Sequence, residues 1–457
     1  YVLYCIKERA CDLDRINAFL NRFLSHERKL RWMRLDNAAK IYPAAKRRKW
    51  NNFFRLSATL CDEVDKTVLR NAMDVTMRRF PSIAVRLCRG AFWYYLEELS
   101  SAPEITDEKS WPLAHTPFES INECALRVIV YKNRIAVEFY HALTDGTGGM
   151  VFLKSLLAEY IEQKYGVEIP NECGVLDRLT QPQEEELEDS FSKNAGSVSV
   201  SRNASTAFKI HYTPERDDFR HLTTFILDSN AALAAAKSCG VSLTVYLTSA
   251  MLLALQRIQD EQTPDKRRQK PIRVVVPVNL RRLFPSRTLR NFVHVIMPEI
   301  DPRMGDYEFS EILTSVKHQL GLLVTKKNLC AMFTPNVNAE RSPLLRVMPL
   351  FLKNIAMKLV YDTVGERTNC LNLSNLGDIK VPDAMRRYVT RFDFILGVQA
   401  TKPNNCGVLS YNGKLYMNFI RNTVEPVLEF QFYQVLRELG LHVKVESNGA
   451  GNVLIPN

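Results

Sequence analysis

Several patterns that would assign a chain to a common class of protein are missing from these 457 residues. No apolar run is long enough to span a bilayer, and the best candidate, residues 241–255, is interrupted by serine and threonine. Residues 5–22 carry too many charges for a secretory signal peptide. We therefore expect a cytoplasmic protein.

The cysteines give no sign of a metal site or of a disulfide framework. The ten cysteines include no Cys-x-x-Cys pair and show none of the spacings typical of zinc ligands. We expect them to be reduced core residues. The sequence thus predicts no metal site and no permanently bound cofactor.

Nucleic-acid-binding signatures are also missing, although the net charge is +11. Basic residues gather at 46–49, 266–270 and 281–290, without a zinc-finger, helix-turn-helix or aromatic RNA-binding pattern beside them. Most such runs are solvated faces, and a positive field suits any anionic ligand. We expect no nucleic-acid partner.

The composition is that of a globular protein with two domains. Hydrophobic residues make up 46% of the chain and charged residues 24%, and the length exceeds that of most single domains. Alternating and 3.6-residue patterns predict both strands and helices. Helices are expected at residues 13–24, 64–79, 150–164, 242–258 and 426–439, and strands at 83–87, 126–131, 134–140, 208–212, 223–227, 272–278 and 442–445. A hairpin at 407–419 should turn at Asn412 and Gly413.

These elements form two mixed αβ units joined by a segment of different composition. Residues 176–206 are first acidic and then rich in serine and other small residues, which is typical of a mobile linker. We predict an N-terminal unit at 1–175, a crossover linker at 176–206 and a C-terminal unit at 207–457.

A histidine at the end of a strand is the strongest candidate for a catalytic residue. The alternating segment 134–140 ends directly before His141, and Asp145 follows four residues later. Three glycines at positions 146, 148 and 149 permit close approach of a ligand or a backbone before the helix at 150–164. Asp145 or Thr147 could cap that helix.

The chemistry of this motif has two interpretations. A neutral imidazole in such a turn can accept a proton from a hydroxyl or thiol, which is general-base catalysis. A single histidine is more often a surface residue or a hydrogen-bonded core residue. Asp145 could orient the ring of His141, or it could face away and anchor the turn through an arginine.

Further motifs in the expected order give the pattern a family resemblance. The sequence His141-x-x-x-Asp145-Gly146 resembles the core motif of the chloramphenicol acetyltransferase superfamily, which includes condensation domains and bacterial alcohol acetyltransferases. Residues 276–281 (Val-Pro-Val-Asn-Leu-Arg), 289–293 (Leu-Arg-Asn-Phe-Val) and 373–377 (Leu-Ser-Asn-Leu-Gly) resemble other segments of that superfamily, and 34–43 and 80–82 resemble the opening of the alcohol acetyltransferase branch. Tyr140 replaces the first of the two histidines common in condensation domains, which favours the alcohol acetyltransferase branch.

The resemblance implies a fold, an activity and a set of site residues. The fold would be α/β (an α+β sandwich), with two chloramphenicol acetyltransferase-like subdomains and mixed sheets around a shared cleft and tunnel. His141 would be the general base, and Asp145 a structural anchor paired with Arg281. The other site residues implied are Gly146 in the catalytic turn and Tyr140, Ser374, Asn375 and Tyr411 in substrate binding or oxyanion stabilisation. Residues 374–377 could equally be a turn that closes a strand.

The activity implied is transfer of an acetyl or other acyl group from coenzyme A to an acceptor hydroxyl. Acyl-coenzyme A would be a co-substrate, and the acceptor a small alcohol or a lipid-like molecule. One alternative is a condensation-type enzyme that uses a carrier protein, and another is a catalytically silent binding protein with the same fold. The amphipathic segment 344–361 could contact a membrane surface, line an acceptor tunnel or pack on its own domain.

Overall fold

The structure is a computed structural model of the chain, and it describes residues 30–45, 52–200, 205–216, 218–399 and 401–449. The helix predicted at 13–24, the basic run at 46–49 and two of the cysteines, Cys5 and Cys11, lie outside the described residues.

Sixteen strands are present in the described part of the chain. They are β1 Trp32–Arg34, β2 Phe53–Leu60, β3 Val85–Arg89, β4 Tyr94–Glu98, β5 Ile105–Asp107, β6 Leu126–Tyr131, β7 Arg134–Tyr140, β8 His221–Asp228, β9 Ile272–Asn279, β10 Val293–Ile296, β11 Glu299–Ile300, β12 Leu371–Asp378, β13 Val389–Ile395, β14 Asn404–Tyr411, β15 Lys414–Arg421 and β16 Lys444–Ser447.

The α-helices are α2 Ile41–Ala44, α3 Lys66–Arg79, α4 Phe118–Glu123, α5 Gly146–Tyr165, α6 Glu184–Leu187, α7 Ser190–Asn194, α8 Ser229–Ser238, α9 Leu243–Gln262, α10 Phe309–Leu323, α11 Lys326–Arg341, α12 Pro343–Val347, α13 Leu350–Val360, α14 Asp383–Arg386 and α15 Val427–Glu438. Short 3-10 turns lie at Lys266–Arg268, Leu280–Arg282 and Pro302–Met304, and a π-helical segment at Tyr361–Glu366 follows α13.

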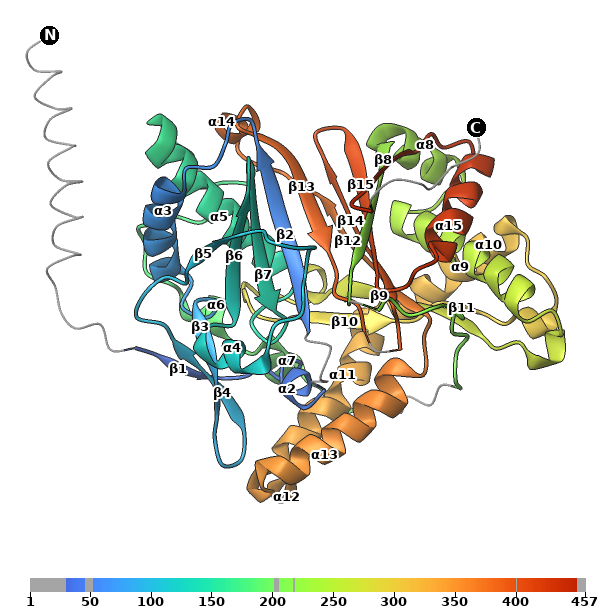
Figure 1. Cartoon of the computed structure of the whole chain (residues 1–457). Helices are drawn as coiled ribbons and strands as arrows, with labels where there is room; N and C mark the ends of the chain where they lie inside the picture. The colour runs from blue at the N-terminus through green and yellow to red at the C-terminus, as the bar shows by residue number, and fades with distance from the viewer. Residues whose placement is uncertain (1–29, 46–51, 201–204, 217, 400, 450–457) are drawn as a thin grey trace, which may run out of the picture.

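Two large mixed sheets stand side by side, each with helices on its outer face (Figure 1). The first has five strands in the order β13-β2-β7-β6-β5, and α5 packs on β2 and on α3. The second has eight strands in the order β10-β9-β12-β14-β15-β8-β16, with β11 paired to β9, and α8 and α9 pack on it. A three-stranded sheet, β1-β4-β3, lies beside the first. The fold is the mixed α/β architecture that the sequence predicted.

The first hydrophobic core contains residues from both halves of the chain. Strand β13 pairs antiparallel with β2, so a segment near residue 390 completes the sheet that begins near residue 53. Phe392 and Phe394 of β13 belong to the first core. The predicted division at 175 and 207 stays a prediction, and the structure adds this exchange. The sequence did not predict this exchange, because pairing between strands that are distant in the chain leaves no periodic pattern at the domain boundary.

The strand that leads to His141 is buried on both faces. Cross-strand pairing places Arg55 of β2 and Arg127 of β6 on either side of Glu138. Both guanidinium groups form ion pairs with the Glu138 carboxylate, which is completely buried. Burial alone would raise the pKa of Glu138, but the two arginines outweigh it and the pKa is lowered. This charged cluster fixes the register of β7.

Several local predictions agree with the structure, and others are wrong. Strands β6 and β7 have the predicted bounds, and Asn412 and Gly413 form the turn between β14 and β15 with positive φ at both residues. No strand forms at 208–212, where the described chain is irregular. The segment expected to be a mobile linker contains α6 and α7, because Phe191 and its neighbours supply apolar groups for the second core.

Two further predictions concern the location of the cysteines and the ability of the apolar helices to span a membrane. The eight described cysteines are free thiols, but Cys61, Cys173 and Cys239 are exposed, so the expectation that they all lie in the core is wrong. No single described helix has the length and apolar content to cross a membrane; α8 and α9 together have both, but the pair is bent by 84°.

A glycine at the contact between the sheets yields a test of this packing. An added Cβ at Gly407 of β14 would lie 2.2 Å from the backbone oxygen of Phe394. We expect Gly407→Ala to lower the free energy of unfolding by about 1–3 kcal/mol. In urea unfolding followed by circular dichroism, Gly321→Ala on α10 is the control, because its Cβ meets nothing within 4 Å and alanine favours the helix. Equal effects of the two substitutions would contradict the close contact.

Candidate functional site

Three segments that are far apart in the sequence meet around His141. The first is the turn between β7 and α5, the second is the segment after β1 and at α2, and the third is the stretch between β9 and β10. His141 donates its backbone N–H to the oxygen of Asn52 over 2.7 Å, and Asn52 donates through Nδ2 to the backbone oxygen of Tyr42. These contacts hold the histidine at the end of β7.

The imidazole of His141 lies between two aromatic rings. Its centroid is 4.7 Å from that of Tyr42, with the rings nearly parallel, and 5.1 Å from that of Phe54, which meets it edge-on. Phe54 also stacks on Phe139 inside the first core. The ring of His141 is therefore clamped by packing, and it keeps partial exposure to solvent.

Asn291 determines which nitrogen of His141 carries the proton. Its Nδ2 donates to the backbone oxygen of His141 over 3.0 Å and to Oδ2 of Asp36 over 3.3 Å. Its Oδ1, which can only accept, lies 3.2 Å from Nδ1 of His141. Nδ1 must therefore donate, and Nε2 retains the lone pair that a general base requires.

Burial favours the neutral forms of both ionisable groups in this cluster. It lowers the pKa of His141 below the usual value, although its own backbone carbonyl, Asp145 and Asn291 each act in the opposite direction. Burial also raises the pKa of Asp36 to about 6, against the opposing effect of Arg290. An uncharged imidazole at neutral pH follows, and this is the protonation state that can accept a proton.

The carboxylate of Asp145 faces away from the imidazole and accepts four hydrogen bonds. Oδ1 accepts from the backbone N–H groups of Thr147 and Gly148 and so caps α5. Oδ2 accepts from Nη1 of Arg281 and from the backbone N–H of Phe292, each at 2.8 Å. Asp145 is thus the helix cap and also the contact between the two halves of the chain.

Arg281 is held in place by more than the ion pair. Its Nε donates to the oxygen of Thr288 over 2.9 Å, and its Nη2 donates to the oxygen of Arg290 over 2.5 Å. The guanidinium therefore fixes the loop that carries Asn291. The predicted pair of Asp145 and Arg281 is present in the structure, and it holds the loop whose Asn291 contacts the imidazole.

Glycine is required where the two segments touch. A Cβ at Gly148 would lie 2.1 Å from the backbone oxygen of Leu289, and one at Gly146 would lie 2.8 Å from Cδ2 of Leu376. Thr144 donates its hydroxyl to the same oxygen of Leu289 over 2.6 Å. The glycines of the motif thus permit close approach between parts of the chain itself.

The predicted residues Ser374 and Asn375 lie near the turn, on β12. Ser374 pairs with Gly407 of β14, and a Cβ added at either Gly407 or Gly146 would lie within 3.5 Å of the Phe394 side chain, so Ser374 lies on the side of the sheet that the turn approaches. Asn375 donates to the hydroxyl of Thr244 over 3.2 Å and accepts from the N–H of Gly377 over 2.8 Å. Ser374 is therefore the better placed of the two to meet a ligand beside Gly146.

The two predicted tyrosines occupy other places. Tyr140 is almost fully buried in the first core beside Phe53, with no hydrogen-bond partner for its hydroxyl among the described residues. Tyr411 donates to the backbone oxygen of Val389 over 3.0 Å. It lies on the same face as Gly407 but about 13 Å farther along the strand. Its hydroxyl is thus engaged in the core, and a contact of Tyr411 with the substrate stays a prediction.

Residue-by-residue reasoning missed three members of the site. Asn291, Asp36 and Tyr42 all lie inside segments that carry the family resemblance, yet none was given a role. The resemblance of residues 34–43 and 289–293 to the superfamily was the sequence pattern that could have identified them. Only the tertiary structure brings them to the same imidazole.

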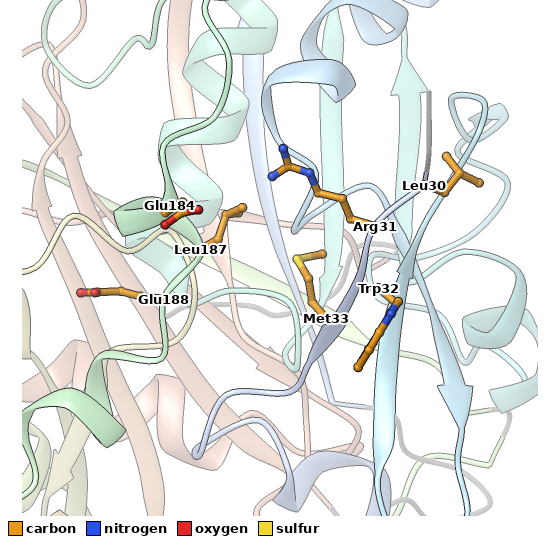
Figure 2. Close-up of a pocket in the computed structure, with 7 residues that line it drawn as sticks. All are labelled: Leu30, Arg31, Trp32, Met33, Glu184, Leu187 and Glu188. Atoms are coloured by element: carbon orange, nitrogen blue, oxygen red, sulfur yellow. The ribbon is translucent and has the colours of Figure 1, made fainter. Parts of the chain in front are cut away.

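The structure also has a surface pocket that is lined by none of the residues around His141 (Figure 2). It has a volume of about 460 Å³ and lies between the start of β1 and α6. Its lining comprises Leu30, Arg31, Trp32, Met33, Glu184, Leu187 and Glu188. It contains none of the predicted site residues, so the shared tunnel stays a prediction. In the described ranges, no group of three or more His, Cys, Asp or Glu side chains could hold a metal ion.

Comparison by sequence gives no relatives, because no family model and no curated protein matches the chain. Comparison by structure gives several. The first condensation domain of the calcium-dependent antibiotic synthetase is similar with a TM-score of 0.57 and 12% identity, over 90% of this chain and 96% of that one. The chain has the chloramphenicol acetyltransferase-like fold of the condensation domains.

Two more neighbours share this fold. TRI3 trichothecene 15-O-acetyltransferase from Fusarium sporotrichioides aligns with a TM-score of 0.52 and 13% identity, over 90% of this chain and 95% of that one. The starter condensation domain of rhizomide synthetase, in complex with C8-CoA and Leu-SNAC, aligns with a TM-score of 0.55 and 11% identity, over 89% and 93%. At these identities the likeness concerns the fold.

The four hydrogen bonds of Asp145 predict a large effect on stability. We expect Asp145→Ala to lower the free energy of unfolding by about 3–5 kcal/mol, because Arg281 would stay buried without its carboxylate. The matched control is Asp228→Ala, an exposed N-cap of α8 that accepts only from Ala231, with an expected loss of about 1 kcal/mol. Similar losses for both variants in urea unfolding would argue against an anchoring role.

Proposed function

We propose that this protein is an acyltransferase that moves an acyl group from a coenzyme A thioester to an acceptor hydroxyl. The observation that carries the proposal is the contact of His141 Nδ1 with Oδ1 of Asn291, which leaves Nε2 as an acceptor. The fold also supports the proposal, because the chain shares it with an O-acetyltransferase and with condensation domains. An oriented, neutral imidazole on this fold suits proton removal from an alcohol.

The reaction is direct transfer in a ternary complex. Nε2 of His141 removes the hydroxyl proton as the acceptor oxygen forms a bond to the thioester carbonyl carbon. The carbon–sulfur bond of the resulting tetrahedral intermediate then breaks, and the thiolate leaves and takes the proton from the imidazolium. No covalent intermediate with the protein is needed.

The negative charge on the tetrahedral intermediate requires a hydrogen-bond donor. We assign this role to Ser374, which lies on the side of the sheet that the turn at Gly146 approaches, while the Asn375 amide is already engaged with Thr244. The backbone amide of Gly146 at the start of α5 is the alternative donor. Loss of one such donor typically costs 10²–10³ in kcat.

The acyl donor and the acceptor are inferred from the structural neighbours. The likeness to a starter condensation domain in complex with C8-CoA supports coenzyme A as the carrier of the acyl group. The acetyltransferase neighbour supports a hydroxyl acceptor, as does Tyr140 at the position of the first of the two histidines common in condensation domains. An alcohol acetyltransferase fits these features, and a carrier-protein-dependent condensation enzyme is the competing assignment.

Replacement of His141 provides the main test. We expect His141→Ala to lower thiol release from acyl-coenzyme A by about 10²–10⁴ with a panel of alcohols as acceptors. The control is His318→Ala, an exposed histidine of α10, which should retain full activity. If the two variants release thiol at the same rate, His141 is not the base. Activity with acyl-carrier protein alone would instead favour the condensation enzyme.

The pH dependence tests the role of Asn291 as a positioning residue. Activity should fall as the pH drops through the pKa of His141, which lies below its ordinary value near 6.5. The hydrogen bond from Nδ1 to Asn291 raises that pKa, so Asn291→Leu should move the acidic limb to lower pH. At neutral pH the variant should lose at least about tenfold in kcat, because the tautomer is no longer fixed. A lower kcat with an unmoved limb would contradict this role.

A further inference from the structure

The two helices α12 and α13 turn an apolar face toward solvent. Apolar residues spaced three or four positions apart within each helix, Leu344 and Val347 on α12 and Phe351, Ile355 and Leu359 on α13, are defined here together as the outer face; the extended residues Met348 and Pro349 separate the two helices. Each of these side chains is between 56% and 71% exposed. Exposed apolar residues scattered singly are ordinary, but five on the outer face mark an interaction site.

The inner side of α13 is held by polar contacts. Lys353 is only 2% exposed, its Nζ lies 3.7 Å from the centre of the Trp93 ring, and it donates to the oxygen of Phe92 over 2.9 Å. Leu350 donates its backbone N–H to the oxygen of Ala91 over 3.0 Å. The arrangement is the reverse of an ordinary amphipathic helix, whose apolar side faces the core.

This orientation excludes one of the alternatives for segment 344–361. Packing of the apolar stripe on its own domain is contradicted, because Leu350 and Lys353 are the buried residues of α13 and they lie off the stripe. Figure 1 shows α12 and α13 at the end of the molecule, projecting away from both large sheets and next to the β3–β4 hairpin. The tip of that hairpin adds the exposed Phe92.

Within residues 341–361 every charged side chain is basic, and the acidic residues Glu340, which pairs with Lys40, and Asp362 lie directly outside this range. Residues 341–361 include Arg341, Arg346, Lys353 and Lys358 and no aspartate or glutamate. Arg346 and Lys358 are exposed at its flanks, and Arg89 is exposed on the neighbouring hairpin. An apolar stripe edged by basic side chains is the pattern of a helix that lies in the interface of an anionic membrane. Basic residues near such a surface are attracted by its negative potential.

We propose that the outer face docks on an anionic lipid bilayer, with its apolar side chains in the headgroup region and Arg346 and Lys358 at the lipid phosphates. A second copy of the chain fits less well, because a symmetric contact would bring the same basic flanks together. The proposal is independent of acyl transfer, since it uses none of the residues around His141.

Vesicle sedimentation of the full-length protein tests the docking. We expect sedimentation with vesicles that contain phosphatidylserine, weaker sedimentation with pure phosphatidylcholine, and release at high salt. Phe351→Ser combined with Ile355→Ser should weaken binding roughly tenfold or more, because the variant lacks two apolar side chains that would move from water into the bilayer. Arg346→Glu combined with Lys358→Glu should abolish the preference for the anionic vesicles.

The control substitutes an exposed pair elsewhere, Lys317→Glu with Leu322→Ser on α10, and it should bind like wild type. Light scattering and circular dichroism of every variant establish the mass and the folding. Equal binding by wild type and the serine variant, or no binding by wild type, would overturn the proposal. So would a wild-type dimer that the outer-face substitutions dissociate, because the stripe would then be a contact between copies.

Discussion

The carboxylate of Asp145 is the group on which the arrangement of this protein depends. One oxygen closes the first turn of α5, and the other accepts from Arg281 and from the backbone of Phe292 in the second half of the chain. A buried carboxylate carries a large desolvation cost unless it is fully hydrogen-bonded. Four donors from two segments satisfy it, so the halves must meet in one relative position.

The position of the imidazole follows from that anchor. The loop that reaches Asp145 through Arg281 and Phe292 also carries Asn291 to Nδ1 of His141. A shift of the loop would therefore break the ion pair between Asp145 and Arg281 and, at the same time, change the orientation of the His141 ring. The glycine at 148 allows the loop backbone to approach within contact distance, so the same close packing serves both the structure and the site. Structural and chemical roles are thus divided between Asp145 and His141.

Local sequence patterns were sufficient where the structure depends on neighbours in the chain. Alternation gave the bounds of β6 and β7, and the strand, glycines and helix around His141 follow from patterns within a few residues. The pairing of Arg281 with Asp145 came from a family resemblance, because the two residues are 136 positions apart. The strand expected at 208–212 failed, since an apolar run forms a strand only when a neighbouring strand offers hydrogen bonds.

The sequence by itself determined the α/β class and the candidate base at the end of its strand, because each has a short-range pattern, whereas the anchoring role of Asp145 was implied by the family resemblance. Tertiary structure alone decided that Asn291 sets the tautomer of His141, that β13 crosses to the first sheet and that Tyr411 is used in the core. It also decided that α13 turns Phe351, Ile355 and Leu359 outward, since the helix is held by Lys353 against Trp93. These outcomes depend on contacts between distant segments, and no pattern along one segment records which partner it will meet.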